Sequence, residues 1–132
     1  MLENLNRIGE KIRADMEAKN SARDTALAQS RELIRYCANA IRAIHRGEFE
    51  EAEHLLKQAQ AVADTMHGET SNYVELEHAG YTQDALKELA EAHLVYALVR
   101  DLPLPDPDEL GVGYASYLNG LGEAVGDLRR YA

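Results

Sequence analysis

Proline, cysteine and tryptophan are scarce in this sequence, and each scarcity excludes a class of structure. The chain contains three prolines, one cysteine and no tryptophan. The single cysteine, Cys37, cannot form an internal disulfide, and no ligands at zinc-site spacing accompany it. No apolar run approaches the roughly 20 residues that span a bilayer, and the first ten residues lack the apolar core of a signal peptide. We therefore expect a cytoplasmic protein with no membrane partner.

Lysine is also scarce, although the chain is rich in charge. Four lysines and ten arginines oppose 23 acidic residues, which gives a net charge of −9. This balance does not favour nucleic-acid binding unless the arginines are clustered, because phosphate affinity comes largely from Lys and Arg. With 45% hydrophobic and 28% charged residues, the 132 residues are typical of one globular domain, residues 1–132, with a modest core.

Helical periodicity dominates the first half of the chain. Apolar residues recur at helical spacing, and no proline or glycine interrupts residues 10–46. We predict one long helix, which Ser21 and Asp24, a pair resembling a capping box, could bend. Gly47 marks its end. A second apolar stripe predicts a helix over residues 49–66, and the short connection makes the two an antiparallel hairpin.

The second half of the chain contains two further predicted helices. Residues 67–80 are typical of a loop with at most one helical turn. A third helix is predicted over residues 82–100, and the three prolines that follow in residues 101–108 break it. A fourth is predicted from Tyr114 to the end, where the amphipathic pattern is still running without a C-cap. The fold class is therefore all-α, an antiparallel helical bundle that we expect to be C-terminally truncated.

Arginines form a row on the first predicted helix, opposite its apolar face. At 3.6 residues per turn they share an arc of about 60° and could track a phosphate backbone. The alternative is a solvated face paired with the glutamates of residues 48–53, and composition alone favours this alternative. The members of the row are Arg31, Arg35, Arg42 and Arg46.

The third predicted helix carries acidic residues on one stripe, namely Asp84, Glu88 and Glu91. Residues 92–99 are apolar nearly all round, as expected where protein covers every face of a helix. Glu91 stands at the edge of that covered segment, and burying its carboxylate is costly unless a cation or a metal shares the site. A salt bridge to the adjacent Lys87 is the simpler alternative.

The fourth predicted helix gives two conflicting signals. Its large apolar residues predict a core face, and Glu123 and Asp127 then fall on the opposite side, as a solvent face with an Asp127–Arg130 pair. Three glycines within seven residues instead indicate that another backbone approaches closely there, since each costs about 1 kcal/mol in a helix. The predicted core residues are Tyr114, Tyr117, Leu118, Leu121, Val125 and Leu128, and the glycines are Gly120, Gly122 and Gly126.

Two helices that each carry a pair of carboxylates could hold Mg²⁺ or Mn²⁺, which can activate water and neutralise charge on a phosphodiester. The spacing by itself is weakly specific. Two Glu-x-x-His pairs and one histidine in an apolar run rank lower, and we expect the pairs on the surface and the histidine hydrogen-bonded in the core. They are Glu51 with His54, Glu75 with His78, and His93. No nucleophile elbow or phosphate-binding glycine loop is present.

Three segments resemble those of the translin and translin-associated factor X family, in its archaeal translin-like branch. They are residues 30–47 (SRELIRYCANAIRAIHRG), 79–92 (AGYTQDALKELAEA) and 117–130 (YLNGLGEAVGDLRR), in the order and spacing of the family. The resemblance implies an all-α fold and a homo-oligomeric shell that binds single-stranded RNA or DNA. In the factor-X-like branch, it also implies RNA cleavage with Mg²⁺.

Carried over by position, the metal-binding carboxylates of that branch fall on Glu88, Glu91, Glu123 and Asp127. The branch more often has Asp where this chain has Glu123, and family members continue into further C-terminal helices. The leading hypothesis is thus a single-stranded RNA-binding, Mg²⁺-dependent endoribonuclease subunit, with the four arginines holding the backbone. The alternatives are a non-catalytic nucleic-acid-binding scaffold and an all-α Mg²⁺-dependent nucleotide pyrophosphohydrolase.

Overall fold

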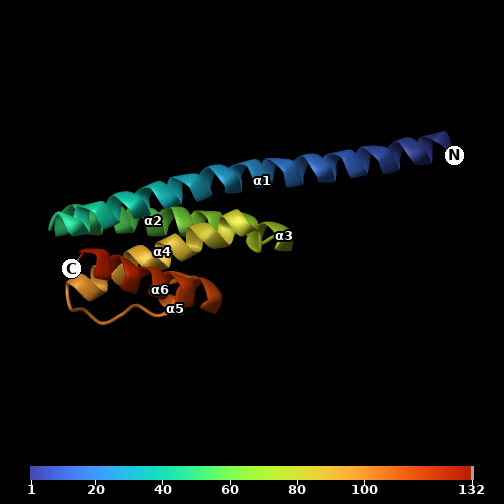
Figure 1. Ribbon diagram of the computed structural model, residues 1–132. Helices are drawn as coiled ribbons and strands as arrows, with labels where there is room; N and C mark the ends of the chain where they lie inside the picture. The colour runs from blue at the N-terminus through green and yellow to red at the C-terminus, as the bar shows by residue number, and fades with distance from the viewer. Residues whose placement is uncertain (132) are drawn as a thin grey trace.

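The computed structural model describes residues 1–131, and within them every regular element is a helix (Figure 1). The all-α prediction is therefore confirmed. No helix in this part of the chain is long and apolar enough to cross a bilayer. The elements are α1 (Leu2–His45), α2 (Phe49–Thr70), α3 (Val74–Glu77), α4 (Gly80–Val99), α5 (Pro107–Leu110) and α6 (Tyr114–Tyr131).

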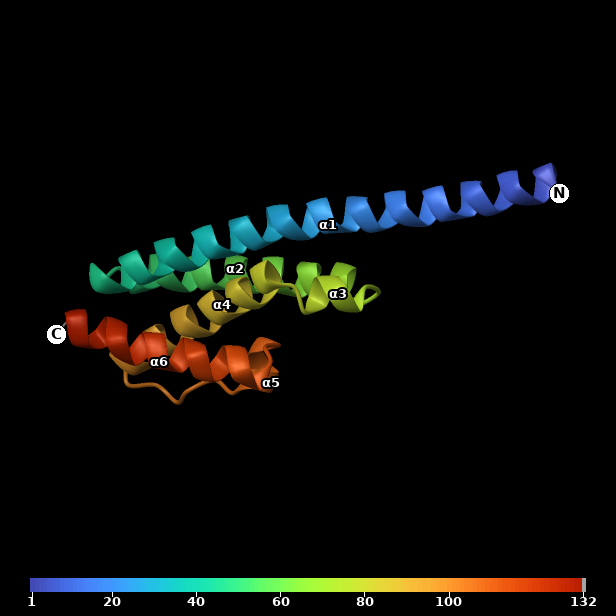
Figure 2. The same cartoon turned by 45° about the vertical axis from the view of Figure 1, so that its right-hand side comes forward.

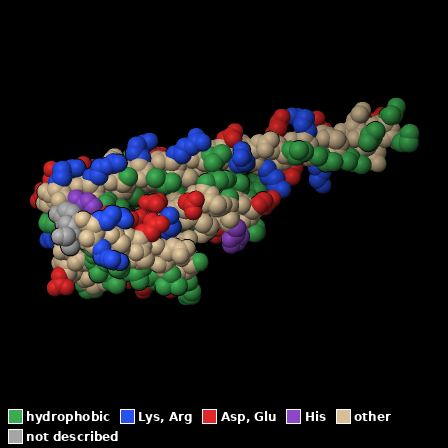
Figure 3. All heavy atoms as spheres, in the orientation of Figure 1, with side chains coloured by type: hydrophobic (Ala, Val, Ile, Leu, Met, Phe, Trp, Pro, Cys, Tyr) green, Lys and Arg blue, Asp and Glu red, His purple; other side chains and the backbone are tan. Residues whose placement is uncertain are grey.

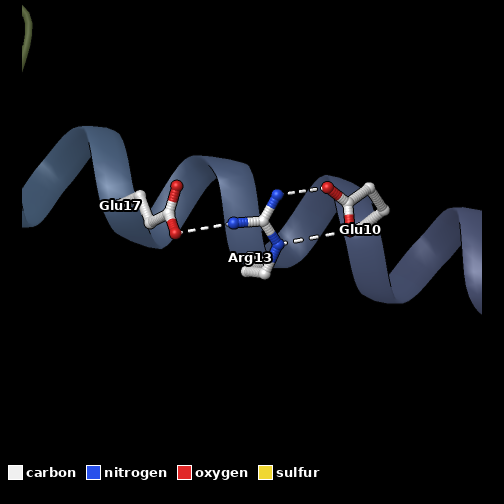
Figure 4. A network of polar contacts seen from close by, with 3 residues as sticks. All are labelled: Glu10, Arg13 and Glu17. Carbon is white, nitrogen blue, oxygen red and sulfur yellow. Dashed lines mark hydrogen bonds and ion pairs between the residues drawn. The ribbon is translucent and has the colours of Figure 1, made fainter.

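Helix α1 is one continuous helix, and no new helix starts at Ser21. Its N-terminal half projects beyond the other helices, as both ribbon views show (Figures 1 and 2). Arg13 bridges Glu10 and Glu17 along this half, with Nη1 2.6 Å from Glu17 Oε1 (Figure 4). Such exposed pairs add only tenths of a kcal/mol each. The apolar stripe of the projecting half is exposed and comprises Leu2, Leu5, Ile8, Ile12 and Met16.

Helices α1 and α2 form the predicted antiparallel hairpin. Gly47 takes a φ of +74°, and the amide of Glu48 donates to the carbonyl of Ala43 at 2.9 Å, which closes the end of α1. Large side chains such as Leu33 and Leu56 fill the core of the bundle, to which α4 also contributes. Periodicity thus located the buried face of these helices correctly.

Two element boundaries differ from the sequence-based prediction. Helix α2 continues through Gly68 to Thr70, and α3 is the single turn expected before α4. The proline-rich segment contains the short helix α5, which was not predicted. Its first residue is Pro107, whose missing N–H is not needed there, and the Asp106 carboxylate accepts a hydrogen bond from the amide of Glu109 at 2.8 Å.

The predicted core face of the last helix is only half correct. In α6, Tyr114, Leu118 and Val125 are 72%, 65% and 48% exposed, whereas Tyr117, Leu121 and Leu128 are half-buried. The buried face instead carries small or polar residues, namely Ser116, Gly120, Ala124 and Asp127. Small side chains allow α6 to pack closely on α4. This close packing contributes more to stability than burial of the larger apolar residues of α6 would.

Candidate metal centre

Helices α4 and α6 make a backbone-to-backbone approach at Gly120. A Cβ atom on Gly120 would lie 2.9 Å from the Lys87 carbonyl oxygen, 2.9 Å from Ala90 Cβ and 3.0 Å from the Glu91 amide nitrogen. Any larger residue would therefore collide with the main chain of α4. The predicted close approach is confirmed at this glycine, whereas a Cβ on Gly122 or Gly126 would meet nothing within 4 Å.

This approach brings together three of the four predicted metal-binding carboxylates. Glu88 and Glu91 of α4 and Glu123 of α6 each place one carboxylate oxygen within 4.8 Å of the other two. Glu91 is only 7% exposed, while the Glu123 side chain is 46% exposed at the rim. The group, hereafter the acidic centre, opens into a surface depression of about 840 Å³. Asp84, Lys87, Glu91, Leu118, Asn119, Gly122, Glu123, Gly126 and Arg130 line the depression.

Burial and crowding determine how the acidic centre is protonated. Burial raises the pKa of Glu91 to about 8, and a hydrogen bond with Glu123 and the nearby charge of Glu88 add to the effect. A hydrogen bond from Lys87 lowers the pKa of Glu123. Near neutral pH, Glu91 therefore retains a proton and donates it to the ionised Glu123 carboxylate. Replacing that proton by a cation would remove the repulsion among the three carboxylates.

Lys87 and Cys37 complete the surroundings of the acidic centre. The Lys87 ammonium lies 3.0 Å from Glu123 Oε1 and 3.5 Å from Glu88 Oε1, so Lys87 pairs with these two carboxylates and not with Glu91. Cys37 of α1 is fully buried, and burial together with the charges of Glu88 and Glu91 raises the pKa of its thiol. The apolar face of α1 thus forms the back wall of the centre.

Asp127, the fourth predicted ligand, lies apart from the group of three. Its carboxylate is 2.7 Å from His45 Nε2 and 3.6 Å from Arg130 Nη2. Asp127 is only 9% exposed, so the solvent-face interpretation is wrong for Asp127, although the expected pair with Arg130 is present. His45 was not among the predicted site residues. Its position four residues after Ile41, on the stripe that begins at Cys37, could have revealed that it faces inward.

Comparisons with known proteins agree with this architecture. An uncharacterized protein of Methanocaldococcus jannaschii is 29% identical over 113 residues, which cover 85% of this chain and 50% of the relative. No family model matches the chain. The crystal structure of AfC3PO superimposes with a TM-score of 0.76 at 32% identity, over 92% of this chain and 63% of that one. C3PO assemblies are of the translin type. The chain is similar in sequence and fold to these translin-type proteins.

Two further structures share this translin-like fold. Apo-NeC3PO matches with a TM-score of 0.77 at 24% identity, over 99% of this chain and 67% of that one. A complex of AfC3PO with duplex RNA matches with a TM-score of 0.76 at 32% identity, over 92% of this chain and 62% of that one. The translin-like chain thus spans about half the length of its curated relative and roughly two-thirds of these structures.

The arginine row of the translin-like chain lies far from the acidic centre. All four arginines are exposed, and they stand about 120° to 180° around α1 from Cys37, which faces the centre. Arg42 donates to Asn39 Oδ1 at 2.7 Å, and Arg46 pairs with Glu48 at 3.1 Å. Figure 3 shows basic side chains along the outer edge of α1. The row and the centre therefore do not form one surface on the described chain.

The remaining candidates are mostly structural. Glu51, His54, Glu75 and His78 are exposed, as predicted for surface residues. His93 is largely enclosed, but its Nε2 atom has no hydrogen-bond partner among residues 1–131, contrary to the prediction of a hydrogen-bonded core histidine. Burial lowers the pKa of His93 to about 4. Its imidazole is therefore neutral at physiological pH.

Proposed function

We propose that the chain is an RNA-binding subunit of a homo-oligomer and cleaves RNA with Mg²⁺ or Mn²⁺ held at the acidic centre. The observation that carries this proposal is the convergence of Glu88, Glu91 and Glu123 from two helices around the nearly buried Glu91 carboxylate. Carboxylate oxygens are the ligands that these hard cations prefer. A bound cation would neutralise charge on a phosphodiester and activate water.

The donor set fits such a cation on electrostatic grounds. Among residues 1–131, no Lys, Arg or His forms an ion pair with Glu91, and its carboxylate shares hydrogen bonds only with two other acids. A buried carboxylate is costly unless a cation accompanies it. The predicted Asp127 ligand remains a proposal, because its carboxylate pairs with His45.

RNA binding is supported by the similarity to AfC3PO, one structure of which is a complex with duplex RNA. Within the depression, Lys87 and Arg130 supply the positive charge nearest to the acidic centre. Phosphate at this place would contact these two residues, while Arg31, Arg35, Arg42 and Arg46 would bind a strand on the outer face of α1. Exposed apolar residues on α1 and α6, such as Ile12 and Leu118, support association with further copies.

The test is cleavage of labelled RNA with and without Mg²⁺, using single-stranded RNA, duplex RNA and single-stranded DNA in parallel. We expect the wild-type protein to cut single-stranded RNA only with the metal. A Glu88→Ala/Glu91→Ala variant should bind the RNA but lose at least about 100-fold in cleavage rate. A Glu50→Ala/Glu51→Ala variant, which removes two exposed acids of α2, is the control. Equal cleavage by both variants would exclude the acidic centre as the active site.

A non-catalytic RNA-binding scaffold is the second candidate, and one observation favours it. Lys87 already neutralises part of the acidic centre through its ion pairs with Glu88 and Glu123. In that case the same experiment would show RNA binding that weakens steeply with salt and no cleavage with any divalent cation.

A further inference from the structure

The acidic centre has two positions where a cation is favoured, and the chain itself fills one of them. Between Glu88 and Glu123, the Lys87 ammonium lies 3.5 Å and 3.0 Å from the carboxylate oxygens. Beside Glu91, which is 7% exposed, residues 1–131 provide no cationic partner. The two positions are adjacent, because the three carboxylate oxygens lie within 4.8 Å of one another.

The position of Lys87 is fixed by the close packing of α4 on α6. Its carbonyl oxygen is one of the atoms that a Cβ on Gly120 would meet at 2.9 Å, so its backbone lies directly against α6. Its side chain is only 23% exposed, unlike the exposed Lys57 on α2. The ammonium thus lies beside two carboxylates in a partly enclosed position.

Charge balance then limits what else the centre can hold. Once a cation has replaced the proton of Glu91, three ionised carboxylates and one ammonium leave two formal negative charges, which a single divalent cation neutralises. A second divalent cation would leave an excess of two positive charges in a partly buried site, which is costly. Paired catalytic metals lie about 3.5–4 Å apart and share bridging carboxylates. The space for such a second ion, between Glu88 and Glu123, is where the Lys87 ammonium lies.

We propose that the Lys87 ammonium is the permanent second cation of the acidic centre, which restricts the centre to one divalent ion and presents a positive charge to phosphate beside it. This inference rests on the proposed metal centre. It makes Lys87 a residue that determines metal stoichiometry, in addition to forming a surface salt bridge. Replacing the ammonium by a neutral group should open the position to a second metal ion.

The test counts Mn²⁺ ions by calorimetric titration and records their electron paramagnetic resonance spectrum. We expect one Mn²⁺ per wild-type chain without spin coupling. Lys87→Met should double the stoichiometry to two, with the exchange-coupled spectrum of ions held a few ångströms apart. Lys87→Gln provides a second neutral variant, and circular dichroism checks that both are folded. Lys87→Arg, which keeps the charge, and Lys57→Met, which removes an exposed lysine elsewhere, should each bind one ion.

The outcomes separate this inference from the function on which it rests. A wild-type chain that binds two coupled ions would overturn the role of Lys87 and leave the metal centre intact. The role of Lys87 would also be overturned, with the metal centre intact, if the folded Lys87→Met and Lys87→Gln proteins each bind one ion with wild-type affinity. If neither the wild-type protein nor any variant binds Mn²⁺, the metal centre and this inference both fail.

Discussion

The α1–α2 contact and the α4–α6 contact both join two helices, but they are built from different side chains. Large residues such as Leu33 and Leu56 fill the core beside α1 and α2. On α6, the side that packs on α4 carries Ser116, Gly120 and Ala124, and larger apolar residues such as Leu118 remain exposed. The α1–α2 contact is stabilised by large buried apolar side chains, whereas the α4–α6 contact depends on the close approach of the two backbones.

The difference explains where the chemistry lies. Small residues leave room beside the contact, and Glu123 and Asp127 fall within an arc of about 60° that includes Ser116 and Gly120. The Glu123 carboxylate on that face lies at the edge of the contact, next to the carboxylates of Glu88 and Glu91 on α4. A core of large side chains would have excluded them, because an uncompensated carboxylate in an apolar interior is costly.

The largest expected effect on the contact itself comes from breaking the close approach with Gly120→Ala. The new Cβ would lie 2.9–3.0 Å from backbone atoms of Lys87 and Glu91, which cannot move without shifting α4. We expect a loss of about 2 kcal/mol in the free energy of unfolding, measured with urea, and a weakened Mn²⁺ affinity. The control Gly122→Ala meets nothing within 4 Å and should gain up to about 1 kcal/mol in helix propensity. Equal stabilities for the two variants would contradict this account.

The second prediction concerns Glu91→Gln, which tests the protonation of the carboxylates beside the α4–α6 contact. The pKa of Glu91 in the folded protein is about 8, above the ordinary value of 4.5 for a glutamate, because the carboxyl is buried. Its contribution to stability is therefore full below about pH 4.5 and is lost as the pH rises towards 8. Without metal, we expect the wild-type protein to lose about 3 kcal/mol relative to Glu91→Gln between pH 5 and pH 8.

The difference in stability between the wild-type protein and Glu91→Gln reports on Glu91 alone and not on His93. Burial lowers the pKa of His93 to about 4, so its contribution to stability grows with pH up to about 6.5, opposite in sign to that of Glu91. His93 is present in both proteins, and its effect cancels in the difference. Adding Mg²⁺ at pH 8 should stabilise the wild-type protein much more than the variant. Parallel stability curves would show that Glu91 is not held protonated by its surroundings.

The sequence predicted the helices far better than it predicted what α6 packs against. The extent of α1 and the hairpin at Gly47 follow from local signals, namely periodicity and a glycine that accepts a positive φ. The buried face of α6 depends on which surface α4 offers, and at Gly120 that surface is backbone and the small side chain of Ala90, which the apolar periodicity of α6 does not reveal. The reliable signal was Gly120. The family resemblance singled out Glu123 and Asp127, but no local pattern predicted the pairing of Asp127 with His45.

The smallest effect is expected for Leu118→Ser, which distinguishes the two explanations of α6 packing. If periodicity had located the core, Leu118 would be buried, and the substitution would cost at least about 2 kcal/mol. Leu118 is 65% exposed, so we expect a change below about 0.5 kcal/mol in the free energy of unfolding. Urea titrations at two protein concentrations, with light scattering to follow the oligomeric state, separate the fold of the subunit from its assembly. A concentration-dependent loss in the variant would mean that another copy covers this face of α6. A concentration-independent loss of 2 kcal/mol would mean that the large residues of α6, and not the contact at Gly120, hold the helix in place.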